Sequence, residues 1–192
     1  MERRRILGID PGSQVVGWAI AESDDRGQLA RIASGAWTLG RAPTAMGVRL
    51  HRLHEHLVEV FEKYQPESVA LEAAFFGKNA QSTLRIGEAR GVVLMTAESF
   101  GAPLVELSPA TVKARVAGTG AATKEQVEHL VAVHYGLVDF EPVTADESDA
   151  LAVAACALLE PATQDATSLK TADSGGLKPR NRGKLPPGAT FQ

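Results

Sequence analysis

Short apolar runs with tight turns between them fill the first forty residues of the chain. The runs RRILGID, VVGWAIAE and LARIASGAWTL are rich in residues that favour strands, and the turn sequences DPG and SDDRG lie between them. Three consecutive strands with short connections are typical of an antiparallel meander. We therefore predict that the sheet begins with three antiparallel strands.

After Pro43 the apolar positions change to a helical period. They recur at steps of three and four with His, Arg and Glu between them, which predicts an amphipathic helix that ends before Pro66. The segments ESVALEA and APLVEL then predict strands, and QSTLRIGEARGVVLMTAES between them predicts a second helix. Strands that alternate with helices indicate a partly parallel sheet covered on both faces.

Capping residues predict where the later helices begin. Ser108 followed by Pro109 begins one helix, and Thr123 with Gln126 forms a capping box for another at about 124–135. The alanine-rich segment DESDALAVAACALLE predicts the last helix. The expected fold class is α/β, a mixed five-stranded sheet flanked by helices.

The chain divides by composition into a domain and a tail. Residues 1–160 carry the periodic apolar pattern, and 192 residues in total suffice for one domain with a sizeable core. Residues 161–192 are Pro, Gly, Ser, Thr and Lys with almost no apolar side chains, so we predict a disordered tail.

Several classes of protein are disfavoured by composition. No stretch approaches the roughly 18 apolar residues of a membrane span, and the first apolar run meets Asp10 and Pro11 too early for a signal peptide. The single cysteine, Cys156, lies among small apolar residues and is expected to be buried. A cytoplasmic location is expected from this cysteine usage.

Net charge is the one bulk property that argues against a nucleic-acid partner. The chain carries −3, and its last 32 residues hold five Lys or Arg against two Asp, which leaves −6 for residues 1–160. DNA-binding proteins usually carry a basic surplus, because neutralising phosphates releases counterions. A DNA-binding function therefore requires a local basic stripe, with some acids used as metal ligands.

Four carboxylates lie where a catalytic site is expected. Asp10 ends the first strand, Glu72 lies late in the fourth, and Asp146 and Asp149 share one face of the last helix. Parallel strands end at a common edge, where open α/β folds bind ligands. If the last helix packs across that edge, the four acids converge. Oxygen ligands of this kind select Mg²⁺ or Mn²⁺, and two such ions can hydrolyse a phosphodiester.

Each acid also has an ordinary structural explanation. Asp10 before Pro-Gly is a common turn residue, whereas Asp146 and Asp149 can complement the N-terminus of a helix. Glu72 is flanked by apolar strand residues and needs a partner. The presence of all four on one predicted edge favours the catalytic interpretation.

A second group of aromatic, amide and basic side chains follows the fourth strand and extends to the helix at residue 124. Such groups on loops beside a metal site can hold phosphates, and an exposed aromatic can stack on an unpaired base. The alternatives are a core position for one phenylalanine and a solvated helix face for the basic residues. The candidate DNA-binding residues are Phe75, Phe76, Lys78, Asn79, Arg85, Arg90, Lys113, Arg115 and Lys124.

The histidines do not indicate a zinc site. His51, His54 and His56 lie on the polar stripe of the first helix, with no Cys or further His at ligand spacing.

Taken together, these segments resemble the RuvC family of bacterial Holliday junction resolvases, which belongs to the RNase H-like nuclease superfamily. The resemblance covers about residues 4–160. Sugar kinases and actin-like ATPases share the first of its motifs, whereas the second and fourth are specific. The motifs are ILGIDPGS, ALEAAFFGKNAQSTLRIGEARG, LSPATVKARVAGTGAATKEQV and ADESDALAVA.

The resemblance implies an endonuclease that makes paired symmetric nicks in four-way DNA junctions during recombination and repair. It implies that the four carboxylates bind two Mg²⁺ ions per active site, with Mn²⁺ as a substitute. Lys113 and Lys124 match the lysines of the catalytic groove, and Phe75 matches the aromatic that meets unpaired bases at the junction centre.

The resemblance also implies partners. RuvC-like enzymes are homodimers that cooperate with the RuvA–RuvB branch-migration complex, and the helix after the Phe-Phe segment lies in the dimer interface. Gly87, Ala89 and Gly91 on that helix are small enough for close packing, and the run from Val92 to Met95 supplies apolar surface.

Two functions of other classes compete with this prediction. A nucleotide-binding phosphotransferase of the sugar-kinase and actin type clasps its nucleotide between two related domains, but this chain has one such domain and no second strand-Asp-Gly motif. A non-catalytic junction-binding protein has little reason to keep all four acids. We therefore expect an RNase H-like endonuclease.

Overall fold

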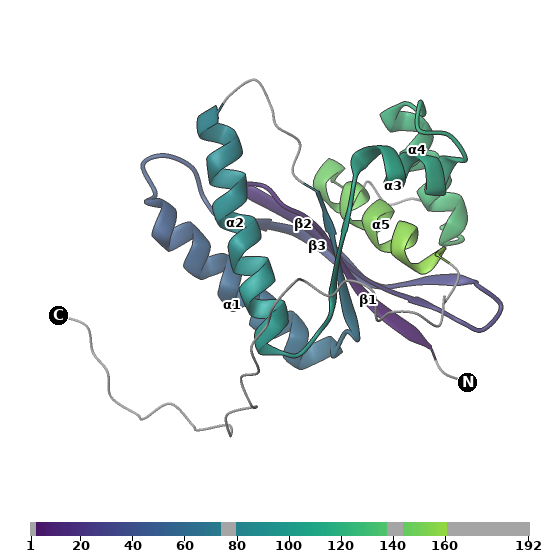
Figure 1. Cartoon of the computed structure of the whole chain (residues 1–192), viewed down its shortest axis with the longest axis horizontal. Helices are drawn as coiled ribbons and strands as arrows, with labels where there is room; N and C mark the ends of the chain where they lie inside the picture. Colours follow the sequence, from purple (N-terminus) through teal and green to yellow (C-terminus); the bar gives the residue numbers. More distant parts are fainter. Residues whose placement is uncertain (1–2, 74–79, 138–143, 161–192) are drawn as a thin grey trace, which may run out of the picture. The chain divides into compact units, whose positions relative to one another are not determined.

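A mixed five-stranded sheet forms the centre of the computed structural model, which describes residues 3–73, 80–137 and 144–160 (Figure 1). In sheet order β3-β2-β1-β4-β5, the first three strands pair antiparallel, whereas β4 is parallel to β1 and β5 is parallel to β4. The predicted meander and the mixed sheet are confirmed. The strands are β1 Arg4–Asp10, β2 Val15–Ser23, β3 Leu29–Thr38, β4 Ser68–Glu72 and β5 Leu104–Leu107.

Helices cover both faces of the sheet, as the alternating pattern predicted (Figure 1). Helices α1 and α2 pack on one face, and α3, α4 and α5 pack on the other. The helices are α1 Met46–Tyr64, α2 Ala80–Ser99, α3 Pro109–Ala117, α4 Lys124–His134 and α5 Ala145–Leu158.

The predicted helix boundaries follow from local capping chemistry. The Ser108 side chain accepts a hydrogen bond from the Thr111 backbone N–H at 3.0 Å, and both halves of the Thr123–Gln126 capping box are present. Helix α1 ends in the left-handed conformation of Gln65, directly before Pro66. The predicted disordered tail, residues 161–192, lies outside the described residues. Within the described part of the chain, no helix is long and apolar enough to cross a membrane.

Alternate residues along each strand face opposite sides of the sheet, and therefore different helices. On β1, Ile6 belongs to the core cluster beneath α5, whereas Leu7 and Ile9 belong to the cluster beneath α1 and α2. On β4, Ala70 faces α5 and its neighbours face α1 and α2. Because side chains alternate along a strand, Asp10 and Glu72 face the α5 side of the sheet.

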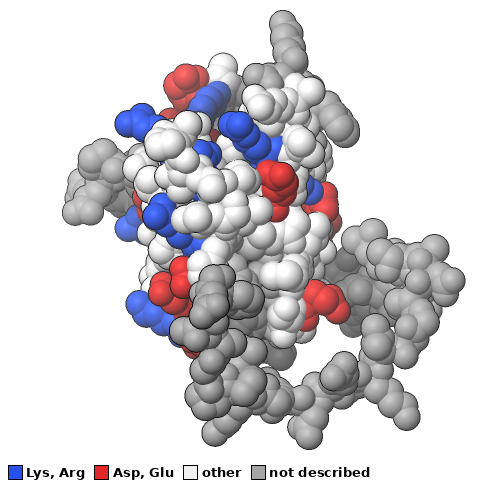
Figure 2. All heavy atoms as spheres, turned by 90° about the vertical axis from the view of Figure 1, so that its left-hand side faces the viewer, with Lys and Arg blue, Asp and Glu red and all other residues white. Residues whose placement is uncertain are grey.

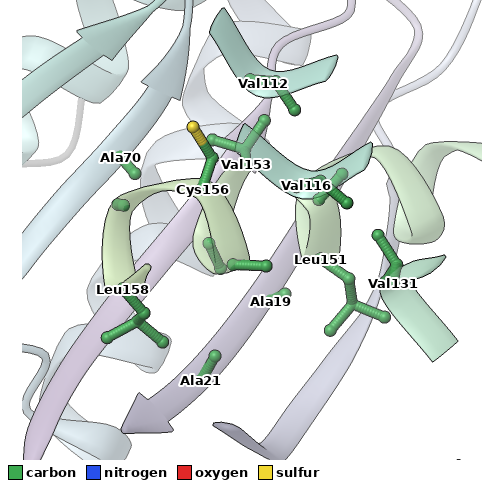
Figure 3. Packing of buried hydrophobic residues seen from close by; sticks show 14 of the residues in the cluster. Ala19, Ala21, Ala70, Val112, Val116, Val131, Leu151, Val153, Cys156 and Leu158 are labelled. Atoms are coloured by element: carbon green, nitrogen blue, oxygen red, sulfur yellow. The ribbon is translucent and has the colours of Figure 1, made fainter. Parts of the chain in front are cut away.

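Helix α5 is buried on nearly all sides, including the predicted buried position of Cys156. Its larger side chains pack against valines of α3 and α4, and the sheet beneath it presents alanines (Figure 3). A Cβ atom on Gly8 would lie 2.5 Å from the Ala150 carbonyl oxygen and 2.7 Å from the Ala154 Cβ. The backbone of α5 therefore lies directly on β1, at a distance that only glycine permits.

We predict that Gly8→Ala lowers the free energy of unfolding by about 2–3 kcal/mol, because the added methyl group overpacks this contact. Urea denaturation measures the change. Gly47→Ala is the matched control, since its Cβ would meet no atom within 4 Å, and it is expected to be neutral or stabilising by up to about 1 kcal/mol. Equal stability of the two variants would contradict the proposed contact.

Candidate active site

Two of the four predicted carboxylates lie side by side at the ends of neighbouring parallel strands. Ile9 of β1 pairs with Leu71 of β4, so the next residues along the two strands, Asp10 and Glu72, are adjacent. Both face α5, and the nearby charge of Glu72 is one of the causes that raise the pKa of Asp10. The shared strand edge thus brings together the two acids that the sequence separates by more than sixty positions.

The first turn of α5 brings the other two acids to this edge. The Thr144 hydroxyl caps the helix by accepting a hydrogen bond from the Glu147 N–H at 3.3 Å. Gly17 lies opposite Asp10 in the β1–β2 ladder, and a Cβ atom there would lie 1.8 Å from the Asp146 carbonyl oxygen. The absence of a side chain at Gly17 therefore allows α5 to begin beside Asp10.

The electrostatics of Asp10 reflect this convergence. Burial is the largest cause that raises its pKa, to about 7, and the charges of Glu72, Asp149 and Asp146 add to it. Burial also raises the pKa of Glu72. A half-buried group of carboxylates repels additional negative charge and attracts protons or cations. The charges of the three other acids thus all reach Asp10.

One of these acids has a basic partner: the Lys124 Nζ lies 2.7 Å from Asp149 Oδ2. Across the described residues, no group of three or more His, Cys, Asp or Glu side chains is arranged as a ready metal cage. Even so, an all-oxygen donor set on rigid elements fits a hard divalent cation rather than a thiophilic one.

The predicted lysines take different positions. Lys124 is the first residue of α4, and its hydrogen bond to Asp149 is the largest cause that raises its pKa. Lys113 lies half-buried on α3, and no described contact joins it to any of the four carboxylates. The structure therefore brings Lys124, but not Lys113, into direct contact with the acids.

Two arginines of the predicted DNA-binding group have hydrogen-bond partners within the structure. Arg90 is 9% exposed; it donates hydrogen bonds to the Glu72 carbonyl oxygen and to Glu106, the latter at 2.6 Å. Its interpretation as a phosphate-binding residue was wrong, because a buried and paired guanidinium cannot meet DNA. The sequence did contain a signal, since Arg90 continues the buried stripe that includes Ala89 and Val93.

Arg115 of α3 contacts the C-terminal end of α5, away from the acids on its first turn. Its guanidinium donates a hydrogen bond to the Cys156 carbonyl oxygen at 3.1 Å and pairs with Glu160 at 3.2 Å. Cys156 lies seven residues beyond Asp149, about 10 Å along the helix. These contacts join α3 to α5, and the DNA contact predicted for Arg115 stays a prediction.

The remaining predicted DNA-binding residues are exposed or lie outside the described part. Arg85 is exposed on α2. Phe75, Phe76, Lys78 and Asn79 fall in residues 74–79, which the structure does not describe. Their roles stay predictions.

The sheet order and the carboxylates at the ends of β1 and β4 define an RNase H-like fold with a candidate nuclease site. Residues 6–157 match the family model described as crossover junction endodeoxyribonuclease RuvC. The chain belongs to this family.

Curated relatives agree with this assignment. RuvC crossover junction endodeoxyribonucleases of Dehalococcoides mccartyi and Ruegeria pomeroyi are each 43% identical to this chain and cover 79% of it, which corresponds to 90% and 89% of their own lengths. Among solved structures, T. thermophilus RuvC in complex with a Holliday junction substrate is 29% identical, with a TM-score of 0.74 over 80% of this chain and 92% of that one. The yeast mitochondrial Holliday junction resolvase, at 18% identity and a TM-score of 0.59, shares the fold.

Proposed function

We propose that this chain resolves Holliday junctions by making paired symmetric nicks in four-way DNA during recombination and repair. The observation that carries the proposal is the cluster of four carboxylates at one edge of the sheet. It occurs in a member of a family named for crossover junction cleavage, and a relative of similar structure has been solved with a Holliday junction substrate. The alternative phosphotransferase function finds no counterpart in these relatives.

The acids are proposed to bind two divalent cations, Mg²⁺ with Mn²⁺ as a substitute. When bound, such a pair supplies a Lewis acid and a nucleophilic water at neutral pH. Asp10, which is influenced by the charges of Glu72, Asp146 and Asp149, would be shared between the two ions; Glu72 would help to hold one, and Asp146 with Asp149 the other. The chain itself contributes fixed positions: the acids stand on strand ends and a helix turn rather than on loops.

Lysine side chains are proposed to balance charge at the scissile phosphate. Lys124 enters the site from the start of α4 and is held there by Asp149, so its ammonium is positioned before DNA binds. Lys113 is assigned the same role from the family resemblance. Phe75, Phe76, Lys78, Asn79 and Arg85 are proposed to contact the junction outside the metal site.

We predict that Asp10→Asn or Glu72→Gln abolishes cleavage of a labelled mobile four-way junction but leaves junction binding intact. Each change removes a metal ligand without removing a phosphate contact. Neither variant is expected to be less stable than the wild type, because a buried carboxylate is removed from a repulsive cluster. Cleavage and gel-shift assays with and without Mg²⁺ or Mn²⁺ test this, with a linear duplex as control. Near-normal turnover at saturating metal would refute the site.

For Lys124→Ala, we predict a fall of roughly 10²-fold in the single-turnover cutting rate, the size expected when one charge-stabilising donor is lost. Junction affinity is expected to change much less, because phosphate contacts lie elsewhere. Single-turnover kinetics at saturating enzyme separate rate from binding. An unchanged rate with weakened affinity would show that Lys124 only positions DNA.

A homodimer is proposed on symmetry grounds. A four-way junction is approximately two-fold symmetric, and one chain has one set of four acids, so paired nicks require two chains. Figure 2 views the molecule from the side of α1 and α2 and shows a largely uncharged central surface with charged side chains around it. On α2 the exposed residues Leu84, Gly87, Gly91, Leu94 and Met95 recur at helical spacing.

The structure corrects part of the predicted interface. Ala89 and Val93 are 0% and 1% exposed, because they pack into the core of their own chain. They cannot contact a partner. Gly87 and Gly91 are exposed, and a Cβ atom at either would meet no atom within 4 Å. Packing within the chain therefore does not require glycine at these positions, whereas close packing of a partner would.

We predict that Gly91→Glu yields a folded monomer that makes few paired nicks. The fold has space at this position, whereas a buried charge in the dimer interface is costly. Sedimentation equilibrium and cleavage of a cruciform plasmid, in which paired nicks give linear product, measure the effect. Gly47→Glu, which also has open space, is the control. A wild-type chain that is monomeric at micromolar concentration and fully active would contradict the dimer.

The RuvA–RuvB branch-migration complex is proposed as the functional partner, and the cytoplasm as the location. The partner is proposed from the family resemblance, and the location from the single cysteine, Cys156, which is buried and free.

A further inference from the structure

Glu147 is the acid of the ADESD segment that the proposed metal site does not use. Its side chain is 14% exposed and points to the edge strand β3. There it accepts a hydrogen bond from the Ser34 hydroxyl at 2.5 Å, and the Arg31 guanidinium lies 3.8 Å away. The side chain directly after Asp146 therefore joins α5 to a strand more than one hundred residues earlier in the chain.

The direction of this side chain is unusual for its place in the helix. Thr144 is the N-cap of α5, so Glu147 occupies the third helical position, where a glutamate commonly hydrogen bonds back to the cap residue in a capping box. Helix α4 has that complete box through Gln126. In α5 only the Thr144 half is present, because the carboxylate of Glu147 is directed to Ser34.

Contacts on two sides hold the first turn of α5. Successive residues of a helix are separated by about 100°, so Glu147 points away from Asp149. Asp149 is held by Lys124 of α4 on one side, and Glu147 is held by Ser34 of β3 on the other. The buried Ser148 hydroxyl between them has no hydrogen-bond partner among the described residues. These two contacts thus hold the first turn of α5 from two different sides.

We infer that Glu147 is a positioning residue: its contact with Ser34 fixes the rotation of the first turn of α5, so that Asp146 and Asp149 face Asp10 and bind the divalent cation tightly. The inference rests on the proposed metal-binding function of this site. Gly17 sets how closely the helix approaches the sheet, and the Ser34–Glu147 contact sets its rotation.

Removing Glu147 also removes a negative charge near the cation, so charge and position must be separated. Ser34→Ala removes the hydrogen bond and keeps the charge. Glu147→Gln removes the charge and keeps an oxygen that accepts the Ser34 hydrogen bond. Glu147→Ala removes both. Glu160→Ala is the matched control, because Glu160 is also paired with an arginine but lies at the far end of α5.

The measurement is Mn²⁺ binding to the full-length protein without DNA. An electron paramagnetic resonance titration quantifies it. Metal-dependent junction cleavage and the melting temperature are recorded for the same variants. We expect Ser34→Ala and Glu147→Ala each to weaken Mn²⁺ binding by about ten-fold, the lower end of the range for residues that orient metal ligands. Glu147→Gln is expected to retain most of the affinity, and the Ser34→Ala/Glu147→Ala double variant to be no weaker than Glu147→Ala. Cleavage is expected to recover at saturating metal.

The opposite pattern overturns the inference. If Glu147→Gln loses as much affinity as Glu147→Ala and Ser34→Ala loses none, Glu147 acts through its charge alone. If the variants lower only the melting temperature and bind Mn²⁺ as the Glu160→Ala control does, the contact is merely structural. If the wild-type chain itself binds no Mn²⁺, the proposed metal function fails, and the inference fails with it.

Discussion

The close contact between α5 and the surface of β1 and β2 is the constraint on which the rest of this structure depends. At Gly8 and Gly17 the helix backbone occupies the space of the missing side chains. The neighbouring alanines of the sheet also have small side chains that let the helix lie close. With ordinary side chains there, the helix would stand several ångströms further from the sheet. The two helix acids would then lie too far from Asp10 to act with it. The same packing thus provides the core of one face and the geometry of the candidate site.

The cluster of acids explains how an acidic protein can act on DNA. Residues 1–160 carry a net charge of −6, but four of their carboxylates are partly buried at one edge of the sheet. Burial and repulsion by neighbouring acids raise the pKa values of Asp10 and Glu72. The folded state therefore disfavours the ionised form of both carboxyl groups. Such a cost is typical of functional sites. Cations that neutralise the acids also reduce the negative field that a phosphate meets.

Much of the fold was predictable from the sequence because its signals are local. The short apolar runs, Pro66 and the caps at Ser108 and Thr123 predicted the elements closely. The common edge of parallel strands predicted that Asp10 and Glu72 lie together. The errors lie where a side chain's partner is distant in the chain. In α2 the four consecutive apolar residues from Val92 to Met95 cover the whole circumference of the helix, so periodicity could not say which face is buried. The partners of Arg90 and Glu147 lie on other elements, and no local pattern indicates them.

Helix α2 connects the candidate site to the proposed dimer. On its inner side Arg90 donates a hydrogen bond to the carbonyl oxygen of Glu72 and pairs with Glu106 on β5, which ties the helix to the strand ends at the site. Its outer side carries the exposed stripe with Gly87 and Gly91. A partner packed on that stripe would therefore be connected through the single helix α2 to Glu72, one of the four carboxylates of the candidate site. In a two-fold dimer this rigid connection fixes the separation of the two sites, which a resolvase must match to two strands of a junction.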